Sequence, residues 1–354
     1  MKQLIDFKEE IHKCSKCGLC QGECPIYKIT GNDCSVSRGQ FVMLSGLIKG
    51  DLKMTKIINS YLDLCLKCGA CSKFCPSGID IVDIIVAAKA EYFKKHKFEK
   101  LVSFFQKNFV FKFAPNFVSL FRLRTKSKTF EKKVLYFGGC GSKIKGDKAV
   151  VKILNSLNVE VINPTFSCCG ISLFMRGDLE SFNNSITNYV NVLKKYDIKE
   201  VVTTCASCEK TLKDYARWCD SVEQREFLST ITVKNIYEYL KDEHLVLKKP
   251  VTVTFHKPCN INNYEDVENI LVNTENLNYI KMNGFDKCCG LNAITKIKNY
   301  KITQKVFNQK INNINSAGAK YVLTSCLGCE VALKLYSFGR YKVYDLVEFI
   351  SERV

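Results

Sequence analysis

Two stretches decide how this chain folds: CSKCGLCQGECP at residues 14–25 and CLKCGACSKFCP at residues 65–76. Each stretch spaces its cysteines as C-x2-C-x2-C-x3-C and places a proline after the last one. Zinc sites built on Cys-x-x-Cys pairs need fewer cysteines and no trailing proline. The pattern therefore indicates two iron–sulfur centres held by tight loops.

The spacing is typical of ferredoxin loops that bind cubane [4Fe–4S] clusters, in which the fourth cysteine of one run binds the other cube. We expect set I to be Cys14, Cys17, Cys20 and Cys75. We expect set II to be Cys65, Cys68, Cys71 and Cys24. Gly18 and Gly69 stand where the backbone must approach sulfur closely. Such a crossed pair would carry electrons and perform no bond chemistry itself.

The composition agrees with metal sites in a reducing compartment. The chain has 354 residues and 20 cysteines, and its first ten residues are rich in charge, with no apolar signal core after them. Thiols that stay reduced favour metal binding over disulfides, which predicts a cytoplasmic protein. The formal charge of +18 counts every cysteine as neutral. Ligating cysteines are thiolates, so the charge of the loaded protein is lower, and we expect no nucleic-acid partner.

Residues 134–354 contain an internal repeat, which is the second informative pattern. Each copy has a strand-like run that ends in cysteine, then Cys-Cys-Gly, then strand, Cys-x-x-Cys and helix. The copies open with VLYFGGC, ending at Cys140, and VTVTFHKPC, ending at Cys259. The matching cysteines are offset by 119 to 121 residues, as from Cys140 to Cys259 and from Cys205 to Cys326. Five cysteines in register identify a duplication.

The alternation of strand-like and helical runs predicts two α/β subdomains with parallel sheets behind a helical N-terminal domain. We expect an α+β multidomain chain. Its parts are a mostly helical two-[4Fe–4S] domain at 1–95, a basic aromatic helical connector at 96–133, and cysteine-rich domains at 134–249 and 250–354.

The repeated order C…CCG…C-x-x-C resembles the cysteine-rich CCG domain of the heterodisulfide reductase catalytic subunit. The same domain occurs in the third subunit of anaerobic glycerol-3-phosphate dehydrogenase and in the iron–sulfur subunits of glycolate and lactate oxidases. The resemblance implies site A on Cys140, Cys168, Cys169, Cys205 and Cys208. It implies site B on Cys259, Cys288, Cys289, Cys326 and Cys329. Either site could hold a further iron–sulfur cluster, including a noncubane one, or zinc, and Gly170 and Gly290 would allow a tight turn beside it.

Three residues outside these sets have two interpretations each. His256, three residues before Cys259, is either a donor to cluster sulfur or a core histidine. Together with Lys257 it leads us to expect site B to be the terminal electron site. Cys34 and Cys219 are expected to be structural. The sequence shows no P-loop, Rossmann glycine pattern or Ser/His/Asp set, so we expect no flavin or nicotinamide site and leave the catalytic residues unassigned.

The connector carries twelve Lys/Arg against two acids between Lys94 and Lys133. Leu101, Phe104, Phe105 and Phe109 are expected on one helical face, with a second short helix starting at Pro115. Such a face either packs against the protein or a partner or lies on an anionic membrane surface. No apolar run is long enough to cross a bilayer.

The resemblance to these iron–sulfur subunits implies an oxidoreductase subunit that acts within a complex. It would relay electrons from an FAD-containing dehydrogenase of 2-hydroxy acid or glycerol 3-phosphate type to quinone or another acceptor. One alternative is a disulfide reductase with a noncubane cluster in the CCG region. Another is a non-enzymatic scaffold with zinc in both rear sites.

Overall fold

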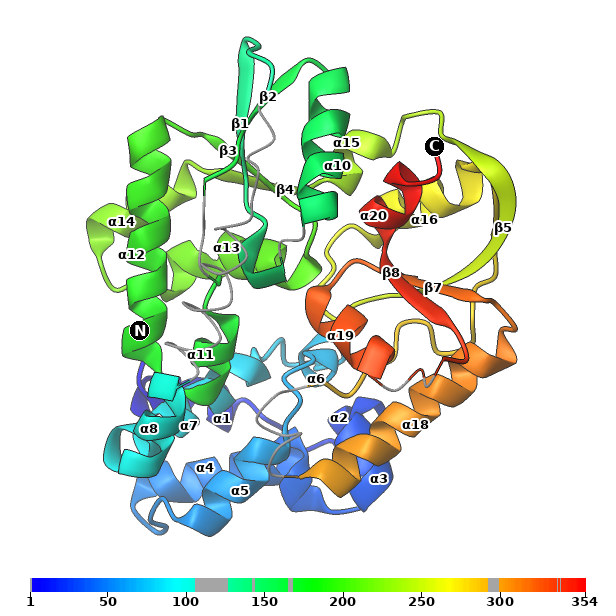
Figure 1. The fold of residues 1–354 in the computed structure, drawn as a ribbon. Helices are drawn as coiled ribbons and strands as arrows, with labels where there is room; N and C mark the ends of the chain where they lie inside the picture. Colours follow the sequence, from blue (N-terminus) through cyan, green and yellow to red (C-terminus); the bar gives the residue numbers. More distant parts are fainter. Residues whose placement is uncertain are drawn as a thin grey trace. The chain divides into compact units, whose positions relative to one another are not determined.

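The computed structural model describes residues 2–105, 127–141, 144–164, 168–291, 299–335, 337 and 339–354 (Figure 1). It has two compact units. The N-terminal unit comprises Met1–Phe104, Ser172–Phe182 and Lys287–Lys310. The repeat unit comprises Phe105–Ile171, Asn183–Asp286 and Ile311–Val354.

The N-terminal unit is helical, as the sequence predicts. Its elements from the first hundred residues are η1 (Leu4–Phe7), α1 (Lys8–His12), α2 (Leu19–Glu23), α3 (Pro25–Thr30), η2 (Asp33–Ser35), α4 (Ser37–Lys49), α5 (Lys56–Leu64), α6 (Ala70–Lys73), α7 (Ile81–Lys95) and α8 (Lys97–Phe105). The helix α7 buries ten of its fifteen residues. A core of aliphatic and aromatic side chains, including Phe41, Leu44, Leu62 and Ile85, joins α4, α5 and α7.

Three later elements belong to this unit wholly or in part: α11 (Ile171–Arg176), α12 (Leu179–Tyr196) and α18 (Tyr300–Ser316). They come from the repeated half of the sequence. Gly177 shows how closely one of these segments packs in the N-terminal unit. It has φ of +91°, and a Cβ there would lie 2.7 Å from the backbone nitrogen of Ala90. Only glycine fits such an approach.

The repeat unit contains two four-stranded sheets with identical topology. The first has β1 (Lys132–Tyr136), β2 (Val159–Ile162), β3 (Glu200–Thr203) and β4 (Thr232–Asn235), in the order β2-β1-β3-β4. The second has β5 (Val246–His256), β6 (Glu275–Tyr279), β7 (Tyr321–Thr324) and β8 (Lys342–Asp345), in the order β6-β5-β7-β8. All six described strand pairings are parallel. The duplication seen in the sequence is therefore a duplication of the fold.

Helices connect these parallel strands, as the crossover rule requires. They are η4 (Gly139–Gly141), α10 (Ile144–Ser156), α13 (Ala206–Trp218), α14 (Val222–Ser229), α15 (Tyr237–Leu240), α16 (Tyr264–Asn273), α19 (Leu327–Leu335) and α20 (Leu346–Ser351), with α12 and α18 between β2 and β3 and between β6 and β7. The two copies share one apolar core. Val134 and Val202 of the first sheet belong to the same buried cluster as Phe255 and Leu323 of the second. The copies therefore fold as one body.

The connector is described only in part. Its first helix is α8, on which Phe98, Leu101 and Phe104 are exposed. Phe109 and the predicted second helix at Pro115 lie outside the described residues. Among those that are described, no helix combines the length and the apolar character needed to cross a membrane.

Candidate metal centres

The four thiols of set I surround one hollow in the N-terminal unit. The lining of the hollow includes Cys14, Cys17, Cys20 and Cys75. Cys75 belongs to the second motif by sequence, and its side chain here lines a space with three cysteines of the first. Phe41, Ile79 and Ile81 cover the hollow on the apolar side. The arrangement offers four sulfur donors to one metal cluster.

The thiols of set II form a second group. Cys24 interacts electrostatically with Cys65 and Cys68, and Cys71 with Cys65, Cys68 and Cys24. Burial, together with the neighbouring thiols Cys65 and Cys68, raises the pKa of Cys24 to about 12. Burial likewise raises the pKa of Cys71. Without positive charge these two sulfurs would stay protonated. A cluster bound there would supply that charge through its iron, because ligating cysteines bind as thiolates.

The backbone of the two loops repeats as well. Gly18 and Gly69 have φ of +84° and +72°, and each precedes the first residue of a short helix, α2 and α6. Lys16 and Lys67, two residues before those glycines, also have positive φ. Left-handed residues at matching positions curl both loops so that three sulfurs face one point.

The proline after Cys24 has a structural role. Pro25 is the first residue of α3, a position at which proline costs no hydrogen bond. Cys24 is the N-cap of that helix, and its sulfur accepts a hydrogen bond from the backbone nitrogen of Tyr27 at 3.4 Å. The Cys-Pro step therefore ends one loop and fixes the direction of the fourth sulfur.

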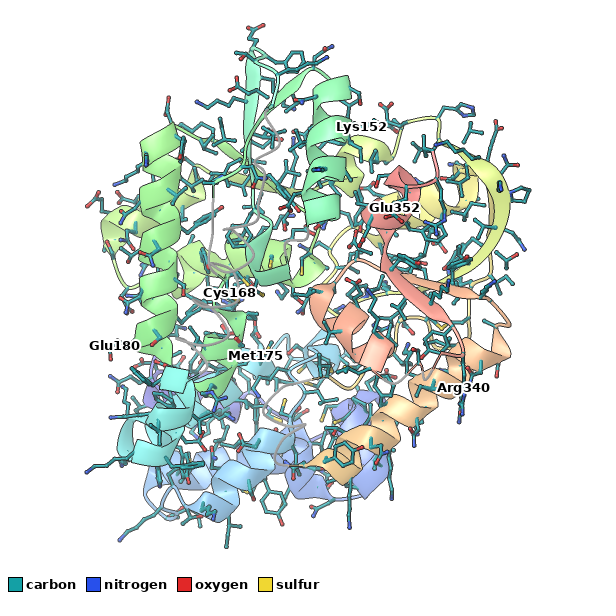
Figure 2. All side chains as sticks on the ribbon, in the orientation of Figure 1. Lys152, Cys168, Met175, Glu180, Arg340 and Glu352 are labelled. Carbon is teal, nitrogen blue, oxygen red and sulfur yellow. The ribbon has the colours of Figure 1, made fainter. Side chains whose placement is uncertain are left out.

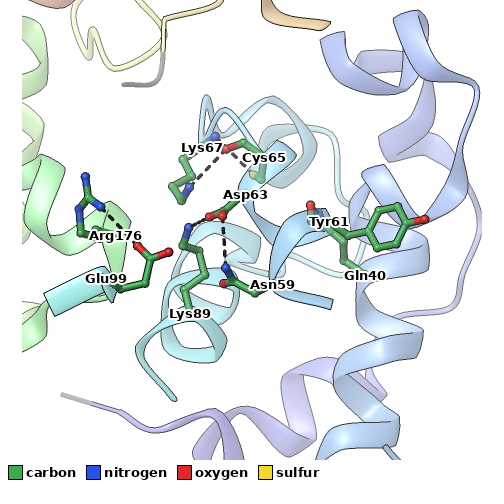
Figure 3. A network of polar contacts seen from close by, with 9 residues as sticks. All are labelled: Gln40, Asn59, Tyr61, Asp63, Cys65, Lys67, Lys89, Glu99 and Arg176. Carbon is green, nitrogen blue, oxygen red and sulfur yellow. Dashed lines mark hydrogen bonds and ion pairs between the residues drawn. The ribbon is translucent and has the colours of Figure 1, made fainter. Parts of the chain in front are cut away.

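A buried network of charges lies beside set II (Figure 3). The ammonium group of Lys89 pairs with the carboxylate of Asp63, and both side chains are almost fully buried. Asn59 donates a second hydrogen bond to Asp63 at 3.2 Å. The Lys67 ammonium donates to the carbonyl of Cys65 at 3.3 Å. Burial, together with the charge of Lys89, lowers the pKa of Lys67 to about 7.

Arg176 and Glu99 form a second buried pair in the same unit, with 3.4 Å between Nη1 and Oε2. Both pairs were missed at the sequence level, because no periodic pattern marks a lysine or aspartate as buried. Buried charges must be paired to be tolerated. Lys67 and Lys89 of this network act electrostatically on Cys65, where both favour the thiolate.

Site A lies within the repeat unit, and its five cysteines form a continuous row. Cys168, labelled in Figure 2, hydrogen-bonds with Cys140 and Cys169. The Cys208 thiol donates to Cys169 with 3.7 Å between the sulfurs, and Cys205 follows through Cys208. The pKa of Cys169 is held well below its ordinary value because its sulfur accepts hydrogen bonds from Cys168 and Cys208. Five soft donors in contact suit iron or zinc.

The row continues into the second repeat. Cys205 precedes α13 and Cys326 precedes α19, so each Cys-x-x-Cys opens a helix directly after a strand. The Cys205 thiol donates to the sulfur of Cys326, which also accepts from Cys329 and has a strongly lowered pKa for that reason. The amide of Ala206 donates to the carbonyl of Ser325 at 2.8 Å. The two motifs therefore meet.

The cysteines predicted for site B are divided between the units. Cys288 and Cys289 belong to the N-terminal unit, whereas Cys259, Cys326 and Cys329 belong to the repeat unit. His256 ends β5, is fully buried, and has a ring nitrogen within 4.8 Å of the Cys329 sulfur. The histidine is thus a core residue and a neighbour of a predicted ligand at once.

The two remaining cysteines differ in environment. Cys219 is buried, and its thiol donates to Gln224 at 3.4 Å. Cys34 in η2 is only half-buried. The structural role expected for both stays a prediction.

Comparison with known proteins identifies the group. Residues 10–79 match the 4Fe-4S dicluster domain, and residues 134–213 and 253–334 both match the cysteine-rich CCG domain. The chain is a CCG-domain iron–sulfur protein of the oxidoreductase type. The thiol sets fit this assignment, because each ferredoxin loop presents cysteine sulfur from a curled backbone and the two sets exchange their fourth member.

Relatives of this iron–sulfur protein span nearly its whole length. It is 22% identical to the probable glycolate oxidase iron–sulfur subunit of Bacillus subtilis, covering 95% of this chain and 92% of that one. It is 24% identical to a subunit of the dihydromethanophenazine:CoB–CoM heterodisulfide reductase of Methanosarcina mazei, covering 97% and 94%. It is 26% identical to an uncharacterized iron–sulfur protein of Methanococcus maripaludis, covering 92% and 68%.

A solved structure shares the fold of this iron–sulfur protein. A hypothetical protein from Helicobacter pylori matches with a TM-score of 0.53 at 11% identity, over 88% of this chain and 67% of that chain. These comparisons confirm three predictions: the family suggested by the cysteine motifs, the fold class and the iron–sulfur cofactors.

Proposed function

We propose that this protein is the electron-transfer subunit of a complex in which an FAD-containing dehydrogenase oxidises a 2-hydroxy acid or glycerol 3-phosphate. Electrons would pass through this chain toward quinone or another acceptor. The observation that carries the proposal is the exchange of Cys24 and Cys75 between the two loops, which sets two four-sulfur groups side by side. Relatives named as glycolate oxidase iron–sulfur subunits, in Bacillus subtilis and Escherichia coli, support the partner.

The proposal assigns a [4Fe–4S] cubane to set I and another to set II. Bound there, such clusters accept and release single electrons. The chain supplies the thiolates, the curled loops that aim them and the buried charge beside set II. Hydride removal from an organic substrate needs a flavin or nicotinamide, so that step belongs to the partner chain. Sites A and B are proposed to hold further clusters or zinc.

An electron-delivery assay tests the proposal. The chain would be reconstituted anaerobically and mixed with a reduced FAD dehydrogenase encoded beside it. We expect the cubane absorbance to bleach and a quinone analogue to be reduced, in proportion to added chain. Failure of the cubanes to accept electrons from the flavoprotein, with both clusters loaded, would contradict the proposal.

A second candidate function rests on a separate observation. The sulfurs of Cys169, Cys208, Cys205 and Cys326 form a row that joins the two Cys-x-x-Cys motifs. A bound disulfide needs two electrons and two protons to give two thiols, and a sulfur-lined row could deliver them in single steps. Similarity to the heterodisulfide reductase chain of Methanosarcina mazei supports this candidate. Thiol release from an added disulfide by the dithionite-reduced protein would favour it over the relay.

A peripheral contact with the inner face of the membrane is also proposed. Phe98, Leu101 and Phe104 recur every three residues on α8 and are 68%, 51% and 60% exposed. Basic residues surround them in the sequence, which suits an anionic surface. Flotation with vesicles that contain anionic lipid, at low and at high salt, tests this contact. Equal recovery with neutral vesicles would contradict it.

A further inference from the structure

Cys288 differs from its counterpart in the first repeat. Both residues open a Cys-Cys-Gly motif, and by sequence both belong to the rear sites. Cys168 hydrogen-bonds with Cys140 and Cys169, which are members of its own repeat. Cys288 instead hydrogen-bonds with Cys68, a ligand of set II. The same motif position therefore has different partners in the two copies.

The contact between Cys288 and Cys68 is well supported by packing within the N-terminal unit. Cys288 and Cys24 pack against the same small apolar cluster, formed by Ile26, Leu64, Leu66 and Val306. Cys288 is thus a neighbour of two set II cysteines, Cys24 and Cys68, one from each ferredoxin loop. Apolar surroundings strengthen a sulfur–sulfur contact because they exclude water from it.

Neighbouring residues hold the segment in place. The Lys287 ammonium lies 3.1 Å from the carboxylate of Glu23, the residue before Cys24. The amide of Gly290 donates to the Cys288 sulfur at 3.4 Å, which orients that sulfur from the other side. Gly290 has φ of +79°, and a Cβ there would lie 3.3 Å from Val306. The Cys-Cys-Gly turn therefore packs closely against the apolar side chains that also contact Cys24.

We propose that Cys288 tunes the reduction potential of set II by donating a hydrogen bond to the sulfur of Cys68, a contact within the N-terminal unit, although the position of Cys288 in the sequence makes it a predicted ligand of site B. This rests on the proposed cubane in set II. By sequence Cys288 is a rear-site residue, and by contact it is a neighbour of the set II sulfurs. A donor to a ligand sulfur stabilises the reduced cluster and raises its potential. Cys288 thereby influences how readily set II holds an electron.

The test compares two adjacent cysteines. Cys288→Ala and Cys289→Ala each remove one predicted site B ligand, so both weaken that site alike, but only the first removes the contact with Cys68. The set II midpoint potential would be measured by redox titration with paramagnetic resonance in the full chain. We expect a lower set II potential in Cys288→Ala than in Cys289→Ala, with the set I potential equal in both. Cys168→Ala, the counterpart in the first repeat, should leave set II unshifted.

Equal set II potentials in the Cys288 and Cys289 variants, or a shift of the same size in Cys168→Ala, would overturn the proposal. If Cys288→Ala folds poorly, Cys288→Ser keeps a donor and should restore most of the potential. Lys287→Glu, at a half-exposed side chain, should shift set II in the same direction as Cys288→Ala by loosening the segment. Absence of both cubane signals in the unaltered protein would instead contradict the proposed function, and the two failures are therefore distinguishable.

Discussion

Cys205 of the first repeat donates a hydrogen bond to the sulfur of Cys326 of the second. The contact does not stand alone, because the Ser207 hydroxyl lies 3.2 Å from the same sulfur and Asn260 donates to Ser207 at 3.2 Å. The equivalent Cys-x-x-Cys motifs of two duplicated folds thus meet at one place. A metal bound at either motif would therefore change the electrostatic environment of the other motif.

This contact predicts a cross-link in the metal-free protein. Stripping the metal with a chelator and adding a thiol oxidant should join Cys205 and Cys326, with loss of two electrons and two protons from the thiols to the oxidant. Non-reducing peptide mapping by mass spectrometry would detect the joined peptides. The fully loaded protein should resist the same treatment, because its thiolates are bound to metal. A stripped protein in which neither cysteine ever joins the other repeat would contradict the geometry.

Metal content provides the second prediction. Anaerobically prepared protein should contain about eight irons from the two cubanes, and about sixteen if sites A and B also hold four-iron clusters. Iron and zinc would be counted by elemental analysis against protein concentration. Iron near zero with stoichiometric zinc after reconstitution would contradict the assignment of sets I and II.

The exchange of ligands between loops predicts an asymmetric effect of one substitution. Cys24→Ser should damage the cluster on Cys65, Cys68 and Cys71 and leave the set I cluster largely intact. Paramagnetic resonance of the reduced protein separates the two signals. Cys34→Ser, ten residues away and outside both sets, is the matched control and should leave both signals unchanged. Selective loss of the set I signal in Cys24→Ser would show that the ligands are not exchanged.

The buried pair of Lys89 and Asp63 predicts a large loss of stability when one partner is removed. Lys89→Met should lower the free energy of unfolding by about 3–5 kcal/mol, because it leaves an uncompensated buried carboxylate. Denaturant unfolding under anaerobic conditions measures this. The double variant Lys89→Met with Asp63→Asn should recover part of the loss. The exposed pair of Lys194 and Glu223 is the control, and Lys194→Met should change the free energy of unfolding far less, because solvent screens the two charges. Equal costs at the two sites would contradict the buried network.

Local features of the fold follow from the sequence. The predicted alternation of strand-like and helical runs is present, for example where α18 at Tyr300–Ser316 is followed by β7 at Tyr321–Thr324. Both rest on periodicity and length, which depend on neighbouring residues alone. The duplication also follows, since cysteines in register over 119 to 121 residues are visible without coordinates. Identical sheet orders then result from identical patterns.

The cysteine chemistry was likewise readable from the sequence. Spacing within a loop of a dozen residues decides which sulfurs can face one metal, and the trailing proline decides where the fourth points. His256 shows the limit of such reasoning, because the structure confirms only one of its two interpretations. The residue is fully buried, as expected of a core histidine, whereas its role as a donor to cluster sulfur stays a prediction. A side chain's neighbours across a sheet do not appear in its own sequence.

Tertiary structure decided everything that depends on pairing distant segments. The sequence divides the chain at residue boundaries, whereas the structure places residues 172–182 and 287–310 with the N-terminal helices. It also brings Cys288 to Cys68 and pairs Lys89 with Asp63, contacts that join residues 220 and 26 positions apart. The sequence by itself determined the ligand types, the two ferredoxin loops and the repeated fold, because short-range spacing and periodicity encode them. Which sulfur touches which across the chain was decided only by packing, since burial and long-range contacts are properties of the assembled core.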